Sequence, residues 1–215
     1  MDEKFLLLIN REWTHPALDL IMAAVSCFDA WTWWMLIGAV IMLKVGGFRA
    51  RVFLISVALI IGVNDGVIAK QLKRIVDRPR PHQVLHDVRQ VDLVKARPRF
   101  LALAKPPVVQ MSRPKLQEVE GRSFPSGHTV NMFSTAVVAI AAFGRSAWWT
   151  FLIAGTVGYS RIYTGAHWPS DVLATIPLAI GATLLLLALL EWAWQRFGSH
   201  WLPEVHALHP TLLAA

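Results

Sequence analysis

The sequence is poor in cysteine and in charged residues. Its 215 residues include one cysteine, Cys27, so the chain has no internal disulfide and no cysteine cluster of the kind that holds a structural zinc ion. Charged residues make up 16% of the chain and hydrophobic residues 55%, whereas soluble domains carry about 25% charged residues. This composition argues against an ordinary soluble domain and predicts an integral membrane protein with a single domain over residues 1–215.

Several other features are also missing. The N-terminal segment does not combine a basic start, an apolar core and a small-residue cleavage site, so we expect the first apolar stretch to stay in the mature protein. The chain has no internal repeat, no Gly/Ser linker and no motif that reads nucleic acid. No cluster of Asp, Glu and His looks like a metal cage. We therefore expect no cofactor, no metal and no nucleic-acid partner.

Five apolar runs follow one another along the chain. A spanning helix needs about 20 residues, and the clearest candidate is the charge-free run 172–190. The run 17–43 is longer than one span and contains Asp29, which divides it into an interfacial helix near 17–28 and a span that starts near residue 30. The other runs are 52–69, 130–143 and 147–159. The expected fold class is all-α: a polytopic transmembrane helix bundle of five or six spans, with an N-terminal interfacial helix and one long basic loop.

Positive charge is concentrated in one loop. Between Arg74 and Phe124 the chain has eleven Arg or Lys against five acids. Such a basic surface beside membrane spans indicates anionic lipid headgroups or phosphate substrates. The segment 82–122 is rich in proline and basic residues, and we expect it to form an irregular loop at the headgroup level.

The segment S-R-I-Y-T-G-A-H-W-P-S-D, residues 160–171, places His167 four residues before Asp171. One helical turn would bring the carboxylate to the imidazole, where it would keep one ring nitrogen protonated and leave the other as a nucleophile or base. Pro169 and Asp171 would also open a helix, which is the structural alternative for the acid. Arg161 stands at the end of a span, where it would grip a substrate or reach toward headgroups.

The segment P-S-G-H, residues 125–128, precedes the third apolar run. Pro125 and Gly127 predict an irregular turn ahead of a helix, so the backbone N–H groups of Ser126, Gly127 and His128 would be free to bind an anion. His128 adds an imidazole that could donate a proton to a leaving oxygen. The alternative is a capped helix start without a catalytic role.

The segment K-R-I-V-D-R-P-R-P, residues 73–81, follows the second apolar run. Arg78 and Arg80 each precede a proline, and such residues avoid the helical region, so both arginines should project from a stiff, extended strip. Guanidinium groups bind phosphate oxygens through two hydrogen bonds, and Lys73 adds a point charge. The alternative is a positive flank of the kind that follows many spans.

The apolar runs place these segments on one side of the membrane. The second span would end near Lys73, the third would begin near His128, and the fourth and fifth would end and begin near Arg161 and Asp171. The three segments should therefore meet.

Asn64 and Asp65 lie inside the second span, about two helical turns before Lys73. Intramembrane acids are costly and usually functional. A paired structural acid is nearly as good an explanation, so Asp65 is not included among the catalytic residues.

The three segments together resemble the motifs of the type 2 phosphatidic acid phosphatase superfamily, K-x6-R-P, P-S-G-H and S-R-x5-H-x3-D. Every defined position matches: Lys73, Arg80, Pro81, Pro125, Ser126, Gly127, His128, Ser160, Arg161, His167 and Asp171. The match covers residues 73–171, roughly half of the chain. The stretch I-N-R-E-W-T-H-P-A-L-D, residues 9–19, is similar to the start of bacterial members that act on undecaprenyl diphosphate or phosphatidylglycerophosphate.

The resemblance implies a metal-independent lipid phosphatase. His167 would attack phosphorus to give a phosphohistidine, oriented by Asp171, and His128 would protonate the departing oxygen. The equatorial oxygens would be held by Lys73, Arg80, Ser126, Gly127 and Arg161. The substrate would be a lipid phosphate in the membrane, such as a polyprenyl diphosphate, phosphatidic acid or phosphatidylglycerophosphate.

The side of the membrane follows from the short loops. Lys44, Arg49, Arg51 and Arg145 lie on the face opposite the motifs, which favours motifs on the outer side. The motif loop is itself more basic, but catalysis accounts for several of its charges. We predict a bacterial inner-membrane protein with a periplasmic active site.

The sequence leaves two other functions to compare with a phosphatase. A vanadate-dependent haloperoxidase of the same superfamily is disfavoured by the many spans, because those relatives are soluble. A lipid or anion transporter would need a polar track through several spans, and apart from Asn64 and Asp65 the spans are apolar.

Overall fold

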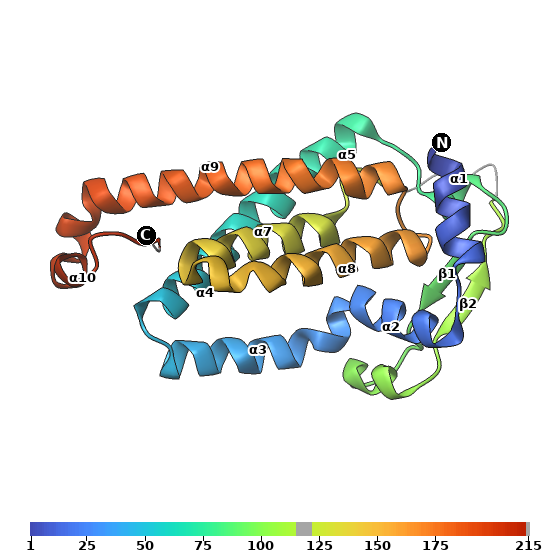
Figure 1. The fold of residues 1–215 in the computed structure, drawn as a ribbon, viewed down its shortest axis with the longest axis horizontal. Coiled ribbons are helices and arrows are strands. Elements are labelled where there is room, and N and C mark those ends of the chain that lie inside the picture. Colours follow the sequence, from blue (N-terminus) through green and yellow to red (C-terminus); the bar gives the residue numbers. More distant parts are fainter. Residues whose placement is uncertain (115–121, 214–215) are drawn as a thin grey trace.

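The computed structural model describes residues 1–114 and 122–213, so the end of the basic loop lies outside the described part. The long helices are α3 (Phe28–Val45), α4 (Phe48–Val63), α7 (Gly127–Phe143), α8 (Thr150–Tyr163) and α9 (Pro169–Trp201). The shorter elements are α1 (Asp2–Leu7), η1 (Leu8–Glu12), α2 (Pro16–Ser26), η2 (Asn64–Ala69), α5 (Lys70–Val76), α6 (Pro81–Val84), β1 (Arg89–Asp92), η3 (Arg99–Ala104), β2 (Val108–Met111), η4 (Arg145–Trp149) and α10 (Pro203–Leu208). Helices α3, α7, α8 and α9 run along the long axis of the molecule, and α4 with α5 crosses them obliquely (Figure 1). The predicted all-α class is confirmed.

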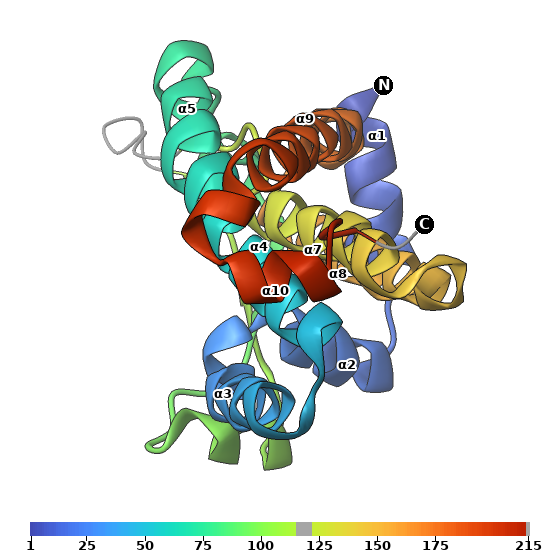
Figure 2. The same cartoon turned by 90° about the vertical axis from the view of Figure 1, so that its left-hand side faces the viewer.

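Three helices of the described part are long and apolar enough to cross a membrane: Phe28–Val45, Phe48–Val84 and Pro169–Trp201. Only 6% of the 18 residues of α3 are buried within the protein. The helix stands apart from the bundle, beside α2 (Figure 2). Its outward apolar side chains are those expected of a lipid-facing surface. The chain is an integral membrane protein. Its number of spans stays a prediction, because α7 and α8 are only 17 and 14 residues long.

The first apolar run is divided as predicted, but two residues earlier. Helix α2 ends at Ser26 and α3 begins at Phe28, so the break falls at Cys27. Asp29 lies in the first turn of α3, where the helix dipole favours an acid. The last span is longer than its apolar run: α9 opens at Pro169, as predicted, and continues to Trp201.

Helix α7 is the centre of the bundle, enclosed by α4, α8 and α9 (Figure 2). Its contact faces are rich in small buried residues, such as Ala136 and Ala139, and they meet Ala154 of α8 and Ala179 of α9. Small side chains let helix backbones approach closely, which is how helices associate in a membrane.

Asn64 ties three helices together in the middle of the bundle. Its amide nitrogen donates to the hydroxyls of Ser134 in α7 and Thr183 in α9, both at 2.9 Å. The residue opens the π-helical turn η2, which continues α4 into α5. For Asn64 the structure therefore supports a packing role.

The basic loop is more ordered than predicted. The composition of residues 82–122 predicts an irregular segment. In the structure, β1 and β2 instead form an antiparallel hairpin in which Gln90 pairs with Gln110. Buried and exposed side chains alternate at the end of β1, as they do in a strand with one face on a core: Val91 is 4% exposed, and Asp92 beside it faces outward.

Asn10 fastens this hairpin to the bundle. Its amide nitrogen donates to the carbonyl oxygens of Arg89 at 2.8 Å and Tyr163 at 2.7 Å, and its amide oxygen accepts from the Arg89 N–H at 2.8 Å. Asp19 adds a second tie, because it pairs with Arg89 at 2.7 Å and accepts from the Tyr163 hydroxyl at 2.7 Å. The N-terminal segment therefore joins β1 to the end of α8.

We predict that Asn10→Ala frees the hairpin. The substitution leaves buried backbone groups without partners, at about 1–3 kcal/mol for each such group. The expected result is a lower apparent melting temperature in detergent and faster proteolysis between residues 82 and 122. Gln195→Ala is the control, since it removes an exposed amide that bonds within α9. Equal effects of the two substitutions would contradict the role given to Asn10.

Candidate active site

The three sequence segments meet at one end of the bundle. Lys73 lies in the last turn of α5, Gly127 opens α7, Arg161 lies in the last turn of α8, and Asp171 lies in the first turn of α9. These helix ends lie toward the side of the molecule that carries β1 and β2 (Figure 1). The predicted gathering of the segments is therefore found in the structure.

Asp171 is the buried acid of the site, with 0% of its surface exposed. Its carboxylate accepts hydrogen bonds from Arg78 at 2.7 Å, from the backbone N–H of Trp168 at 3.2 Å and from the Ser123 hydroxyl. A buried carboxylate is costly unless it is paired and hydrogen-bonded. These three donors meet that need and fix the orientation of the carboxylate.

Arg78 connects this acid to the N-terminus of the chain. Its second guanidinium nitrogen lies 2.6 Å from Asp2, and its guanidinium carbon is 5.1 Å from the centre of the Trp168 ring. Asp2 also accepts a hydrogen bond from the backbone N–H of Ser170 at 3.0 Å. Of the two arginines in the R-P-R-P strip, Arg78 therefore binds carboxylates inside the protein, and Arg80 is left for a substrate.

His167 is 3% exposed and lies in the turn between α8 and α9. Its Nδ1 is 3.9 Å from Asp171 Oδ2 and 3.5 Å from the Ser123 hydroxyl oxygen. The predicted approach of the imidazole to the acid is found, but not through a helical turn, because α9 begins only at Pro169. Ser123 contacts both groups and was not predicted; its only sequence signal is a hydroxyl residue two positions before Pro125.

The surroundings of His167 keep its ring neutral. The pKa of His167 is lowered to about 4, chiefly by burial, with the charges of Arg161 and Arg80 acting in the same direction and Asp171 opposing them. The ring is therefore unprotonated at neutral pH, which is the form that a nucleophile requires. With Nδ1 turned to Ser123 and Asp171, Nε2 is the ring nitrogen left for chemistry.

Ser26, the last residue of α2, holds two of the predicted site residues. Arg161 donates a hydrogen bond to its hydroxyl, and His128 Nε2 lies 3.0 Å from its carbonyl oxygen. His128 also stacks on Phe28, with the ring centres 4.3 Å apart. The break between α2 and α3 is thus part of the site, a role for which the sequence carries no signal.

A cavity of about 270 Å³ adjoins these groups, and its lining includes Ser26, Arg80, His82 and Arg161. Within the described residues, the Nε atoms of Arg80 and Arg161 are buried and have no hydrogen-bond partner. Buried donors are normally satisfied. Two arginine N–H groups of this kind beside one cavity point to an anion with several oxygen atoms.

Ser126 is not available in the way the sequence predicted. Its backbone N–H was expected to be free for an anion, whereas it donates to Thr175 Oγ1 at 3.1 Å. The side chain is fully buried and accepts a hydrogen bond from Thr129 at 3.0 Å. The cause is Thr175, which α9 inserts against the start of α7. The N–H groups of Gly127 and His128 remain candidates for binding an anion, because the first turn of a helix leaves its N–H groups without intrahelical partners.

Gly127 lies where the second span approaches the site. A Cβ atom at this position would lie 3.0 Å from Asp65 Oδ1 and 3.4 Å from Lys73 Nζ, so a side chain would crowd both. The other oxygen of Asp65 lies 3.4 Å from the amide nitrogen of Asn131. Asp65 therefore belongs to the surroundings of Lys73, and it lies in a π-helical turn, a distortion frequent at functional sites.

The turn that carries His167 requires a glycine at position 165. Gly165 has a φ of +71°, and a Cβ atom there would lie 2.6 Å from the carbonyl oxygen of Arg89. The left-handed conformation and the close approach both favour glycine. Strand β1 therefore packs directly on the turn that holds His167.

Comparisons with known proteins identify the family of the chain. The sequence pattern of the PAP2 superfamily matches residues 49–196. Bacitracin transport permease protein BcrC of Bacillus licheniformis is 38% identical over 90 residues, which are 42% of this chain and 38% of that protein. Undecaprenyl-diphosphatase of Sulfolobus acidocaldarius is 42% identical over 53 residues, which are 24% of this chain and 26% of that protein. The chain thus spans well under half the length of either relative in these matches.

A solved structure shares the fold. The crystal structure of Aquifex aeolicus LpxE matches with a TM-score of 0.59 at 22% identity, covering 87% of this chain and 94% of that one. The fold and the site together define a membrane helix bundle with a buried histidine and a group of cationic side chains at one end. The chain belongs to the PAP2 superfamily, as the three motifs predicted.

We predict that Ser123 positions the His167 and Asp171 pair. Ser123→Ala should lower kcat for phosphate release about tenfold or more, because both groups lose a contact, while KM changes about twofold or less. Ser123→Thr keeps the hydroxyl and should recover part of the rate. Ser146→Ala removes an exposed hydroxyl just beyond the end of α7 that lies opposite the motifs, and serves as the control. A rise in KM at constant kcat would show that Ser123 acts in binding instead.

We also predict that His167 stays neutral in mildly acidic solution. Its lowered pKa means that the folded protein takes up no proton there between pH 6.5 and about pH 4, whereas an ordinary histidine would be charged below pH 6.5. Imidazole nitrogen chemical shifts, titrated in detergent and assigned by comparison with His167→Asn, should show a neutral ring at pH 5.5. A ring that charges near pH 6.5 would contradict the burial argument.

Proposed function

We propose that the protein is an integral membrane phosphatase that removes phosphate from a lipid phosphate or diphosphate. One observation carries the proposal: the buried His167, which approaches Asp171, directly follows Ala166, and Ala166 lines the same cavity as Arg80 and Arg161, the two arginines whose Nε atoms have no hydrogen-bond partner within the described residues. A nucleophile beside preorganised donors is the arrangement that phosphoryl transfer requires. One relative, undecaprenyl-diphosphatase, is named for a substrate of this kind.

In the proposed reaction, Nε2 of His167 attacks phosphorus, and a nitrogen–phosphorus bond forms as the bond to the lipid oxygen breaks. Asp171 stabilises the positive charge that develops on the ring. The equatorial oxygens are bound by Lys73, Arg80, Arg161 and the N–H groups of Gly127 and His128. Water then cleaves the phosphohistidine and releases phosphate.

His128 is the proposed acid that protonates the departing lipid oxygen. In the structure its Nε2 lies 3.0 Å from the Ser26 carbonyl oxygen. To protonate the substrate, the ring must exchange this contact for one to the leaving oxygen, or use Nδ1. In the first case, substrate binding acts on the junction between α2 and α3, which also holds Arg161.

The fixed cations take the part that metal ions play in other phosphatases. Residues 1–114 and 122–213 contain no group of three or more His, Cys, Asp or Glu side chains that could hold a metal ion. Lys73, Arg80 and Arg161 would supply the positive charge instead. The proposal is therefore a metal-independent reaction.

The proposed location is the bacterial inner membrane, with the active site facing the periplasm. Lys44 ends α3, and Arg49 and Arg51 begin α4. Arg145 follows α7, whose opposite end carries His128, so these charges lie away from the site. Short loops rich in Lys and Arg tend to stay in the cytoplasm.

A transporter is the alternative function, since one relative is named a transport permease. Transport needs a polar path between the helices, and Asn64 is the polar residue best placed for one. Its amide nitrogen is instead occupied by Ser134 and Thr183. The cavity with its two buried arginine N–H groups is explained by a phosphatase and not by a path at Asn64.

The proposal is tested with phosphatidic acid, phosphatidylglycerophosphate and a short prenyl diphosphate as substrates, measured as free phosphate with excess chelator present. Wild-type protein should release phosphate, and His167→Ala should lose at least about a thousandfold in kcat, because the covalent route is removed. The control is His200→Ala, an exposed histidine near the end of α9. Turnover by His167→Ala within tenfold of wild type, or activity that requires added magnesium, would overturn the mechanism.

A further inference from the structure

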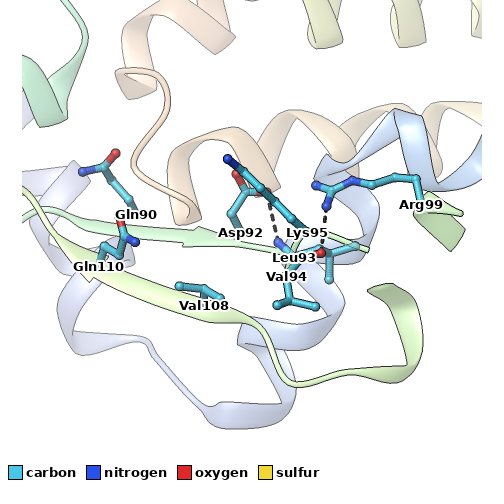
Figure 3. Close-up of a pocket in the computed structure, with 8 residues that line it drawn as sticks. All are labelled: Gln90, Asp92, Leu93, Val94, Lys95, Arg99, Val108 and Gln110. Atoms are coloured by element: carbon cyan, nitrogen blue, oxygen red, sulfur yellow. Dashed lines mark hydrogen bonds between the residues drawn. The ribbon is translucent and has the colours of Figure 1, made fainter. Parts of the chain in front are cut away.

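We propose that the β1–β2 hairpin carries a second binding site, for the polar headgroup of the substrate. A cavity of about 510 Å³ lies against the hairpin. Five polar or charged side chains line it, together with Leu93, Val94 and Val108 (Figure 3). The ligand that fits it carries hydroxyl groups and one negative charge, as a phosphoglycerol diester does. This inference rests on the proposed function, because the headgroup is taken to be joined to the phosphate that His167 attacks.

The strand register builds the polar face of this cavity. Side chains two apart in a strand share a face, so Gln90 and Asp92 line the cavity together, whereas Val91 between them packs into the core. Gln110 lies opposite Gln90 in the ladder, which places the two amide groups next to each other. Figure 3 shows both amides at one end of the cavity.

Two cations complete the polar lining: Arg99 lies at the far end from the amides, and the Lys95 side chain reaches over Asp92 in this view (Figure 3). Lys95 and Arg99 follow β1 in the chain, and both line the cavity. Arg99 donates from one nitrogen to the carbonyl oxygen of Val94 at 2.7 Å, which fixes the guanidinium group and leaves further N–H groups for a ligand. In Figure 3 both cations lie on the same side of β1 as Asp92.

This cavity adjoins the phosphate site. Gln90 and Asp92 line both the hairpin cavity and the cavity that contains Arg80 and Arg161. A lipid whose terminal phosphate binds the two arginines would therefore place its next atoms along β1. The distance is fixed, because Asn10 ties β1 to the end of α8.

The mixture of side chains selects the ligand. Amide and carboxylate groups bind hydroxyls well, because an amide both donates and accepts hydrogen bonds and a carboxylate accepts them. Asp92 would repel a phosphate dianion placed beside it, and Lys95 and Arg99 would repel a quaternary amine. A headgroup with a hydroxyl near Gln110 and one anionic group near Lys95 satisfies both the amides and the cations.

The test compares substrates that differ only beyond the terminal phosphate. Phosphatidylglycerophosphate offers a hydroxyl and a diester, a prenyl diphosphate offers a second phosphate alone, and phosphatidic acid offers neither. We expect Gln110→Ala to lower kcat/KM about tenfold for phosphatidylglycerophosphate only, which corresponds to the loss of about one hydrogen bond to a charged or polar ligand. Lys95→Ala should lower kcat/KM for both phosphatidylglycerophosphate and the prenyl diphosphate. Lys105→Ala, which removes a charge from the same loop outside the cavity, should leave the ratios unchanged.

A binding measurement separates this inference from the proposed function. Calorimetry with soluble glycerophosphoglycerol and the His167→Ala protein needs no turnover, and binding should weaken about tenfold in the added Gln110→Ala variant. If no lipid is hydrolysed but this binding behaves as expected, the phosphatase proposal fails and the headgroup site stands. Substrate ratios within about twofold of wild type in both variants, or loss of diphosphate activity alone, would overturn the headgroup site.

Discussion

A buried carboxylate that must be paired organises the end of the bundle where the three motifs meet. Asp171 has no exposed surface, and its partners come from distant parts of the chain: Arg78 after α5 and Ser123 before α7. Taking such a charge out of water costs several kcal/mol unless good hydrogen bonds replace the water. The positions of the three motifs and the charge of Asp171 therefore depend on each other. The same residues fix the position of the His167 ring, because its Nδ1 faces Ser123 and Asp171.

Away from this end, the membrane requires the bundle to be apolar and its few polar groups to be paired inside it. Helix α7 packs through small residues such as Ala136, and its polar contact at Ser134 is satisfied within the bundle by Asn64. Polar groups at this depth must bond to one another, since lipid offers no partners. Charge therefore accumulates where helices end, and the site forms where α5 and α8 end and α7 and α9 begin.

The sequence predicted what depends on composition and on local pattern. Apolar runs located the helices, Pro169 marked the start of α9, and the spacing of the motifs indicated which residues would meet. What it could not predict depends on contacts between distant residues. Ser26 holds His128 across about a hundred positions, and the N–H of Ser126 is taken by Thr175 of another helix. The hairpin was missed because a four-residue strand, with Val91 buried on one face, is too short to stand out in a basic, proline-rich segment.

The hairpin divides the tasks of the site between two kinds of structure. The motifs hold the groups proposed to bind and attack phosphate. Among them His167 and Asp171 are buried and both contact Ser123, so a substitution at one of the three would disturb the environment of the charge on Asp171. The cavity on β1 and β2 is lined by exposed side chains such as Asp92 and Gln110, whose replacement leaves the packing of the bundle intact. Gly165 allows β1 to touch the turn of His167, so the two surfaces stay at a fixed distance. In the proposed function, selection among lipid headgroups would therefore change on the hairpin without altering the motif residues beneath it.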